Sequence, residues 1–587
     1  MTLIVQTHGS TPQPEHQTEL LAATPEGADV SVDAQADFGY IFRPSGNPDH
    51  YLPAASLDEL DALGNLMVFD PEDQIPNSTL PPLLTYWGQF LDHELSAKTD
   101  RDNDFTNIEI GDPTQTAETI EQGFKNARTP RFDLDSIYGG TPIGPGIGAE
   151  IATIISGMRH PDHPEKMRVR TTDGIDLPDG LDKHRDLPRF SQVSDEVRQA
   201  YLKLAKAKLD PQEFEEFRDK LPKRAIIGDM RNDENLIVAQ FHLSFLRFHN
   251  KVIDFLQAND TGWVADFGAA KTLTKLHYQW LIANVYLPNI CDPDVVERVL
   301  QSRAKHFFSF RDAHRQDNNA SAFGHALPLE FSGAAFRFAH TMVRAGYDYN
   351  RNFGLEANII PSAEFDALFA FTGGGGLGEK IGLGGNETLP GNWVIDWNRF
   401  LNVQGPQNDE TPGRSARPID TQIAPPLAKM LNEGEEEGIS EAVKAMMKQL
   451  ARRNLRRGFS LRLPTGQALH EQLHADGVVT SAPQADVTAW LDNKPDVADF
   501  MRNSSAKLHE RTPLWFYCLA EAEAGGGNQL GEVGSFLVAS TFLGTLFADP
   551  DSALSTRFDP IDSPLKTPEG QPIDSMEAWM KFALVLE

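Results

Sequence analysis

The chain has 587 residues, of which 40% are hydrophobic, so it can bury a large core in one or several domains. It carries 84 acidic and 53 basic residues, and its formal net charge is −31. Such a surface repels phosphate backbones and anionic lipids, so we expect neither a nucleic-acid partner nor adhesion to acidic membranes. The charge favours solubility in a salty medium, with a specific cationic partner as the alternative.

The cysteine content and the absence of long apolar runs limit the class of protein further. Cys291 and Cys518 are too few for a disulfide framework, and we expect two buried thiols. The first ten residues lack the basic segment and apolar run of a signal peptide. No stretch approaches the ~18 apolar residues of a membrane-spanning helix. We therefore expect a soluble protein without membrane insertion.

The pattern along the chain predicts one large, mainly helical domain. Residues 1–40 are polar and contain several prolines, which predicts an irregular arm ahead of a domain over 41–587. Strand patterns are short and few. Helical spacing of apolar residues predicts helices over 83–97, 233–256, 266–286 and 334–346.

Two segments are predicted as loops. Residues 373–385 are rich in glycine and superficially resemble a phosphate-binding loop, but no strand pattern leads into them and no helix follows. Residues 404–438 are acidic and rich in proline, which is typical of a surface loop.

The segment YWGQFLDHE, residues 86–94, holds the first candidate functional residues. His93 suits an acid–base role, because imidazole titrates near neutrality and can accept and then return a proton. Gln89 lies four residues earlier on the same helical face and could hydrogen-bond a water or an anionic substrate. Taken alone, a histidine on such a helix is more often a surface or core residue. Its neighbours change that interpretation.

The segment WGQFLDHE resembles the distal signature W-G-Q-x-x-D-H-D of the animal-type haem peroxidases, the peroxidase–cyclooxygenase superfamily. Glu94 stands where the family has aspartate. Four further segments match in the family's order, and together they span roughly residues 80–470. The chain is therefore identified as a member of this family, and we expect a bacterial one. The resemblance implies a mainly α, single-domain fold, with central helices that sandwich haem b and long loop excursions.

The resemblance also assigns roles on the distal side of the haem. His93 would move the peroxide proton, and Arg231 would polarise the peroxide O–O bond. Asp92 and Glu234 match carboxylates that form ester links to haem methyl groups. Some relatives carry a methionine after this glutamate and form a sulfonium link. Asn235 occupies that position here, so we expect no sulfonium link and an iron too weakly oxidising for chloride.

The proximal side is implied by AFRFAHT, residues 335–341, and by Asn454. His340 would bind the iron as its axial ligand, and Arg337 would offset a propionate charge. Asn454 would accept the Nδ1 hydrogen of His340. Cyclooxygenases and fatty-acid dioxygenases carry a radical-forming tyrosine at the position of Arg337, so its absence argues against fatty-acid oxygenation by that mechanism.

The segment TPRFDLDSIYG, residues 129–139, is similar to the family's calcium loop. Oxygen donors at alternate residues suit a hard cation, whereas the alternative is a simple polar turn. His242 and His249 lie seven residues apart, a spacing that favours packing over a metal pair. By resemblance, the calcium ligands are Glu94, Thr129, Arg131, Asp133 and Asp135.

The sequence thus predicts a haem peroxidase that uses hydrogen peroxide to oxidise small donors through a ferryl intermediate. The expected donors are bromide, iodide, thiocyanate or phenols. The alternatives are a fatty-acid dioxygenase of the same superfamily and a non-catalytic, calcium-dependent interaction module. Such a module could dispense with His93, Arg231 and Asn454, yet all three are present. We expect a monomer that is secreted by an unconventional route, with a cytoplasmic location as the alternative.

Overall fold

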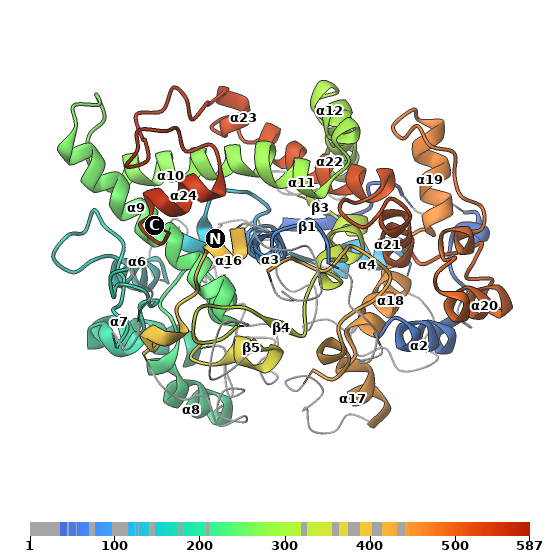
Figure 1. The fold of residues 1–587 in the computed structure, drawn as a ribbon, viewed down its shortest axis with the longest axis horizontal. Helices are drawn as coiled ribbons and strands as arrows, with labels where there is room; N and C mark the ends of the chain where they lie inside the picture. The colour runs from blue at the N-terminus through green and yellow to red at the C-terminus, as the bar shows by residue number, and fades with distance from the viewer. Residues whose placement is uncertain are drawn as a thin grey trace.

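The computed structural model has a mainly helical fold with two small sheets, as the sequence predicts (Figure 1). The structure describes residues 36–43, 46–53, 56–69, 77–96, 116–123, 125–126, 128–139, 147–173, 177, 181–206, 211–317, 326–354, 363–373, 388–401, 414–430 and 441–586.

The helices that frame the centre come from distant parts of the chain. In Figure 1, α3 lies near the middle of the view, with α9, α10 and α22 passing around it. The principal helices are α2 (Leu57–Leu66), α3 (Leu83–Leu95), α4 (Ala117–Gly123), α5 (Asp135–Tyr138), α6 (Ile147–Gly157), α7 (Asp195–Lys206), α8 (Pro211–Lys220), α9 (Leu236–Ala258), α10 (Phe267–Leu281), α12 (Pro293–Gln301), α13 (Lys305–Asp317), α14 (Leu329–Gly333), α17 (Glu441–Met447), α18 (Leu450–Ser460), α19 (Gly466–Ala475), α20 (Pro495–Asn503), α21 (Leu514–Ala524), α22 (Glu532–Ala548) and α24 (Met576–Phe582).

The larger sheet contradicts part of the prediction for residues 1–40. Its order is β2 (Lys125–Asn126), β1 (Ala36–Gly39), β3 (Ala326–Pro328), so the end of the predicted irregular arm forms the central strand. β1 pairs antiparallel with β2 and parallel with β3. These pairings join segments far apart in the sequence, which a local pattern does not reveal. Residues 1–35 lie outside the described ranges. The second sheet pairs β4 (Gly346–Tyr347) with β5 (Ala363–Glu364).

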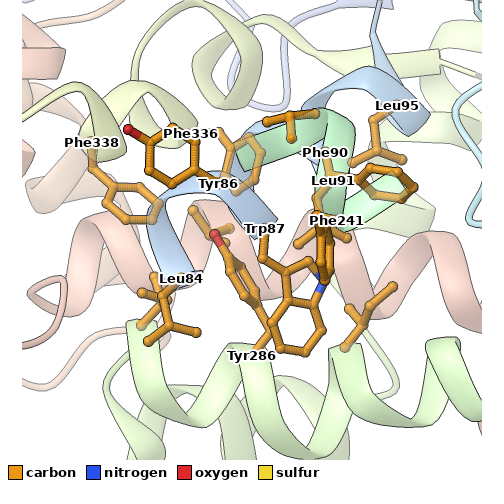
Figure 2. Packing of buried hydrophobic residues seen from close by; sticks show 14 of the residues in the cluster. Leu84, Tyr86, Trp87, Phe90, Leu91, Leu95, Phe241, Tyr286, Phe336 and Phe338 are labelled. Atoms are coloured by element: carbon orange, nitrogen blue, oxygen red, sulfur yellow. The ribbon is translucent and has the colours of Figure 1, made fainter. Parts of the chain in front are cut away.

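Helix α3 is a core helix and is buried on nearly all sides. Two prolines stand at its start, where the missing N–H groups cost nothing. Figure 2 shows Trp87 beside Tyr286, with ring centroids 5.1 Å apart, and Phe90 against Phe241 at 5.4 Å. A helix buried this widely has little freedom to move, so it can hold polar side chains in fixed positions.

The predicted helix over 233–256 begins later than expected. Residues Met230–Asp233 form a 3-10 turn, and α9 starts at Leu236. Asn235 is the N-cap, and its Oδ1 accepts a hydrogen bond from the Val238 N–H at 3.0 Å. The side chain thereby satisfies a first-turn donor, which ends the 3-10 turn and starts the α-helix.

The predicted helix over 334–346 is wrong in type and length. Residues Ala335–His340 form the 3-10 helix η7, and the chain then turns into strand β4. The Thr341 N–H bonds to the Phe338 carbonyl, and the indole of Trp515 donates to the Arg337 carbonyl at 3.2 Å. Because Trp515 uses the carbonyl that an α-helix would need, tertiary packing overrides the helical pattern.

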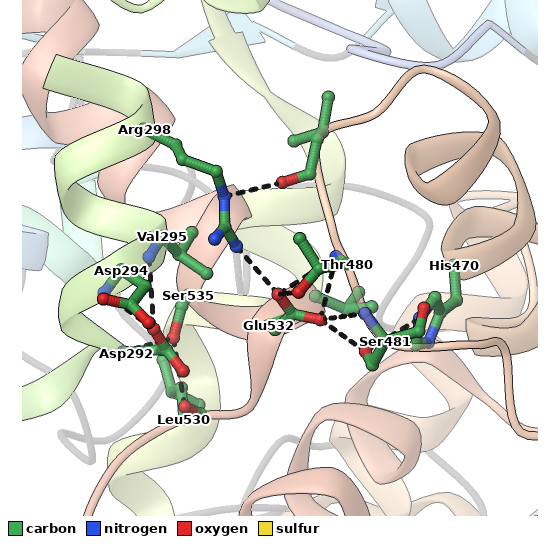
Figure 3. Close-up of polar contacts among 12 residues, drawn as sticks. Asp292, Asp294, Val295, Arg298, His470, Thr480, Ser481, Leu530, Glu532 and Ser535 are labelled. Carbon is green, nitrogen blue, oxygen red and sulfur yellow. Dashed lines mark hydrogen bonds and ion pairs between the residues drawn. The ribbon is translucent and has the colours of Figure 1, made fainter. Parts of the chain in front are cut away.

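A polar network around Glu532, the first residue of α22, connects this helix to α12 and to the segment that contains Thr480 and Ser481 (Figure 3). Its carboxylate accepts hydrogen bonds from the backbone and hydroxyl groups of Thr480 and Ser481, and from Arg298 of α12 at 2.7 Å. These contacts hold the pKa of Glu532 near 2, although burial alone would raise it.

The remaining predictions concern loops, cysteines and membrane spans. Of the predicted loop over 373–385 only Gly373 is described, and of 404–438 only residues 414–430, where Pro425–Ala428 forms a 3-10 turn. Both cysteines are buried free thiols, as predicted. In the described part of the chain, no helix combines the length and apolarity needed to cross a membrane.

Candidate functional site

A cavity with about 1080 Å³ of empty space, part of it open to solvent, lies between α3 and η7. Six of the polar side chains that line the cavity come in three pairs, one pair from α3, one from the turn before α9 and one from η7. These are Gln89, Asp92, Glu234, Asn235, Arg337 and His340.

The structure therefore brings together five of the residues that the sequence singled out. Gln89 and Asp92 come from one helix, Glu234 from the turn before α9, and Arg337 and His340 from η7. Apolar side chains complete the wall, among them Phe336 and Phe369. A concave site that combines apolar walls with convergent polar groups is typical of a ligand or cofactor pocket.

On the η7 side, Asn454 lies behind His340. The Asn454 amide nitrogen is 2.8 Å from Nδ1 of His340, and the Asn454 carbonyl oxygen is buried without a hydrogen bond. A 180° rotation of the amide would place this oxygen against the Nδ1 hydrogen, the arrangement in which Asn454 accepts from His340. With Nδ1 carrying the hydrogen, His340 presents its Nε2 lone pair to a metal.

Two cations lie on the cavity wall near His340. Arg337 donates from Nε to the Ser332 carbonyl at 2.8 Å, which fixes its direction. Arg453 also lines the cavity, a position that sequence reasoning missed although it directly precedes Asn454. Together they supply two guanidinium groups to an anionic cofactor edge.

The turn that carries Arg231 and Glu234 is anchored on two sides. The Thr372 hydroxyl donates to the Glu234 carbonyl at 2.8 Å, and the Gly373 N–H donates to the Asp233 carboxylate at 2.8 Å. Arg189 forms a buried ion pair with Asp233. A side chain at residue 373 would overlap Asp233, so glycine permits this close approach.

His93 is fully buried and does not line the cavity. Its Nδ1 lies 2.7 Å from the Asn232 carbonyl oxygen, and the Asn232 amide nitrogen lies 3.1 Å from Nδ1 of His242. Because an oxygen accepts from Nδ1, the hydrogen of a neutral His93 resides there and the lone pair at Nε2. Burial, with the nearby Arg231, lowers the pKa of His93 to about 3, so the ring is neutral at physiological pH.

The three side chains His93, Asn232 and His242 form one hydrogen-bonded chain. Burial also lowers the pKa of His242 to about 3. Sequence reasoning assigned His242 to packing and did not consider Asn232. The position of Asn232 directly after Arg231 was the available signal.

Arg231 lies next to His93 and likewise does not line the cavity. It donates to the His93 carbonyl at 3.0 Å and to the Asp229 carboxylate at 2.7 Å. Arg128 donates to the same carboxylate at 2.7 Å. Burial favours a protonated Asp229, yet the two guanidiniums hold its pKa below the ordinary value. Arg128 and Arg231 carry two positive charges and Asp229 carries one negative charge, so one excess positive charge remains beside His93.

Three of the predicted calcium ligands, Glu94, Asp133 and Asp135, lie at the start of α5. Glu94 accepts backbone hydrogen bonds from Leu134 at 2.8 Å and Ser136 at 3.1 Å, so it ties α3 to this loop. Burial and the carboxylates of Asp135 and Glu94 raise the pKa of Asp133. Burial raises the pKa of Glu94 to about 7. Among the described residues, no three His, Cys, Asp or Glu side chains form a metal-binding group. A hard cation would relieve the carboxylate repulsion, so the donor chemistry fits calcium.

His249 is a packing residue, as predicted. Its Nδ1 lies 3.1 Å from the Tyr138 hydroxyl, and its Nε2 lies 2.9 Å from the Glu165 carbonyl.

Comparison with known proteins finds a family model that matches part of the chain. Residues 181–368 match the family model for animal haem peroxidase, a range that includes Arg231, Glu234, Arg337 and His340. A "Peroxidase-like protein" of Margaritifera margaritifera is 28% identical over 144 residues. That match covers 24% of this chain and only 17% of the relative's length.

One solved structure shows a similar fold. Peroxidase A from Dictyostelium discoideum has a TM-score of 0.53 at 14% sequence identity, and the alignment covers 99% of this chain and 98% of that one. The fatty acid alpha-dioxygenase of Oryza sativa has a TM-score of 0.48 at 12% identity, with 99% of this chain and 85% of that one covered. At such identities, the likeness to peroxidase A concerns the fold.

Proposed function

We propose that this chain is a haem-dependent peroxidase of the animal haem peroxidase family, whose family model matches residues 181–368. It would reduce hydrogen peroxide and oxidise small donors such as bromide, iodide, thiocyanate or phenols. One observation carries the proposal. Gln89, Asp92, Glu234, Arg337 and His340 line the same cavity, and this shared lining supports the proposed assignment of distal and proximal residues.

The residues on the η7 side would hold the cofactor. His340 would be the axial ligand, and Asn454 would keep its hydrogen on Nδ1. Arg337 and Arg453 would neutralise the haem propionates. Bound haem supplies the redox-active iron.

The α3 side would bind peroxide and move its proton. His93, neutral and with its lone pair at Nε2, would accept a proton and return it to the leaving oxygen. Arg231 would stabilise the negative charge that develops. Since neither side chain lines the cavity, these roles require that peroxide or a water reaches them past Gln89. Asp92 and Glu234 line the cavity, where they could form the two ester links.

We also propose that Glu94, Thr129, Arg131, Asp133 and Asp135 hold calcium. The proposal is supported by the mutual repulsion of the buried carboxylates and by the direct tie between Glu94 and the loop. The ion would connect this loop to the helix that carries Gln89, Asp92 and His93.

The deciding experiment is the absorption spectrum of protein purified with haem available, recorded before and after addition of hydrogen peroxide. We expect a histidine-ligated ferric Soret band that shifts with peroxide. The variant His340→Ala should lose this band, whereas His474→Ala, at an exposed histidine on α19, should keep it. A folded wild-type protein without a haem band would exclude the proposal.

A fatty-acid dioxygenase is the second candidate, and one observation favours it. Tyr86 lines the cavity and is buried, so an oxidisable tyrosine is present although Arg337 occupies the family's tyrosine position. Oxygen uptake with linoleate that disappears in Tyr86→Phe would support this function. No uptake by haem-loaded wild-type protein would reject it.

A further inference from the structure

Asn235 and Gln89 form a hydrogen bond inside the cavity. The Asn235 amide nitrogen donates to the Gln89 carbonyl oxygen at 3.0 Å, and both side chains line the cavity wall. Asn235 is also the N-cap of α9, since its Oδ1 accepts from the Val238 N–H at 3.0 Å. Asn235 therefore caps the start of α9 and also holds the side chain of Gln89 in place.

These two contacts determine the direction of both amides without ambiguity. A backbone N–H only donates, so the Asn235 atom that faces Val238 is the oxygen. The other end of the Asn235 amide is then the nitrogen, which also donates. Its partner on Gln89 must accept and is therefore the oxygen. The Gln89 nitrogen, with its two hydrogens, remains for a ligand.

A pair of N–H donors favours a ligand that accepts hydrogen bonds. Within the described part of the chain, the Gln89 amide nitrogen bonds to no protein atom. A small anion can accept from one of these hydrogens, and hydrogen bonds to charged groups are about twice as strong as neutral ones. Asp92 and Glu234 line the same cavity and would oppose an anion as free carboxylates, but not as haem esters.

We propose that Asn235 is a specificity-determining residue that holds Gln89 as a hydrogen-bond donor, so that the site prefers small anionic donors such as thiocyanate over neutral phenols. The inference rests on the proposed peroxidase function and narrows its donor class. Asn235 thus orients Gln89, in addition to lacking the sulfur atom that a sulfonium link needs.

Two substitutions separate the roles of Asn235. The variant Asn235→Ser retains a good N-cap but is too short to reach Gln89. The variant Asn235→Asp also retains the cap, but its second oxygen cannot donate. Gln89 should then turn its nitrogen toward the aspartate and present its oxygen to the ligand. The control variant is Asn259→Asp, which adds the same negative charge at the exposed C-cap of α9. This position lies roughly 35 Å from Asn235 along the helix.

The measurement is the dissociation constant of thiocyanate from the ferric holoenzyme, obtained from the change in the haem spectrum. We expect a roughly ten- to a hundredfold weakening in Asn235→Asp and a smaller weakening, about threefold or more, in Asn235→Ser. Asn259→Asp should match the wild type. The ratio of kcat/KM for thiocyanate to that for guaiacol should fall in the same order.

Failure of the inference differs from failure of the proposed function. If Asn235→Ser binds thiocyanate as tightly as the wild type while Asn235→Asp does not, charge alone explains the loss and the inference is overturned. Equal affinity in all variants overturns it as well. A wild-type protein that binds no haem overturns the peroxidase function, and the inference with it.

Discussion

Asn454 lies 2.8 Å from His340, although 114 residues separate them in the sequence. His340 belongs to η7, and Asn454 belongs to α18, whose side chains pack into the core. The contact joins the side chain proposed as the axial ligand to a fully buried amide. With its carbonyl oxygen toward Nδ1, Asn454 would set the tautomer of His340 from a helix that also contributes Leu450 and Arg453 to the cavity wall.

Replacing Asn454 by leucine should weaken haem binding. Without the amide, the Nδ1 hydrogen of His340 has no acceptor, and outer-shell changes of this kind cost about ten- to a hundredfold in affinity. Haem transfer to an excess of apomyoglobin measures the loss rate. Asn454→Asp, which keeps an acceptor, should retain haem better than Asn454→Leu. Equal loss rates in wild type and Asn454→Leu would show that the contact does not matter for binding.

Replacing Asn232 by aspartate should shift the pH dependence of peroxide consumption. A carboxylate beside His93 stabilises the imidazolium, so the pKa of His93 should rise above its present value of about 3. The proton-accepting form is the neutral ring, so the acid limb of the rate profile should move to higher pH. Asn232→Leu should slow the reaction without this shift. An unchanged acid limb in Asn232→Asp would argue against His93 as the proton acceptor.

Removal of calcium should destabilise the wild-type protein. A chelator leaves Glu94, Asp133 and Asp135 to repel one another, so Tm should fall. In Glu94→Gln the effect of the chelator should be smaller, because one ligand charge is already absent. Calcium content by atomic emission provides the direct check. A wild-type protein that contains no calcium, with a Tm insensitive to the chelator, would remove the ion from the proposal.

Replacing Glu532 by glutamine should cost stability in a pH-dependent way. The wild-type carboxylate accepts several hydrogen bonds, and the loss of its charge should cost about 1–3 kcal/mol at pH 7. Since the folded pKa is lowered to about 2, this stabilisation is present above the unfolded value and is lost as pH falls through 2. Urea unfolding at pH 7 and pH 2.5 should show a smaller difference between the two proteins at low pH. The same difference at both would contradict the charge argument.

The sequence by itself determined α3 and five of the residues that line the cavity, Gln89, Asp92, Glu234, Arg337 and His340. Gln89 and Asp92 stand on one helix at fixed spacing, and Arg337 and His340 stand three residues apart in η7. Short-range spacing of this kind survives because neighbouring residues share one element, whatever the surroundings do. The free thiols Cys291 and Cys518 were predictable for a similar reason, since their number alone excluded a disulfide framework.

Only the tertiary structure decided the contacts that orient these residues. Local pattern predicted an irregular segment where β1 pairs with β3, and an α-helix where Trp515 binds the Arg337 carbonyl. The hydrogen bonds from His93 to Asn232 and from Asn235 to Gln89 join residues far apart in the sequence. Each of these hydrogen bonds forms only when two elements pack against each other. The packing of the elements therefore selects the partner of a side chain, and the spacing of residues along one element does not predict it.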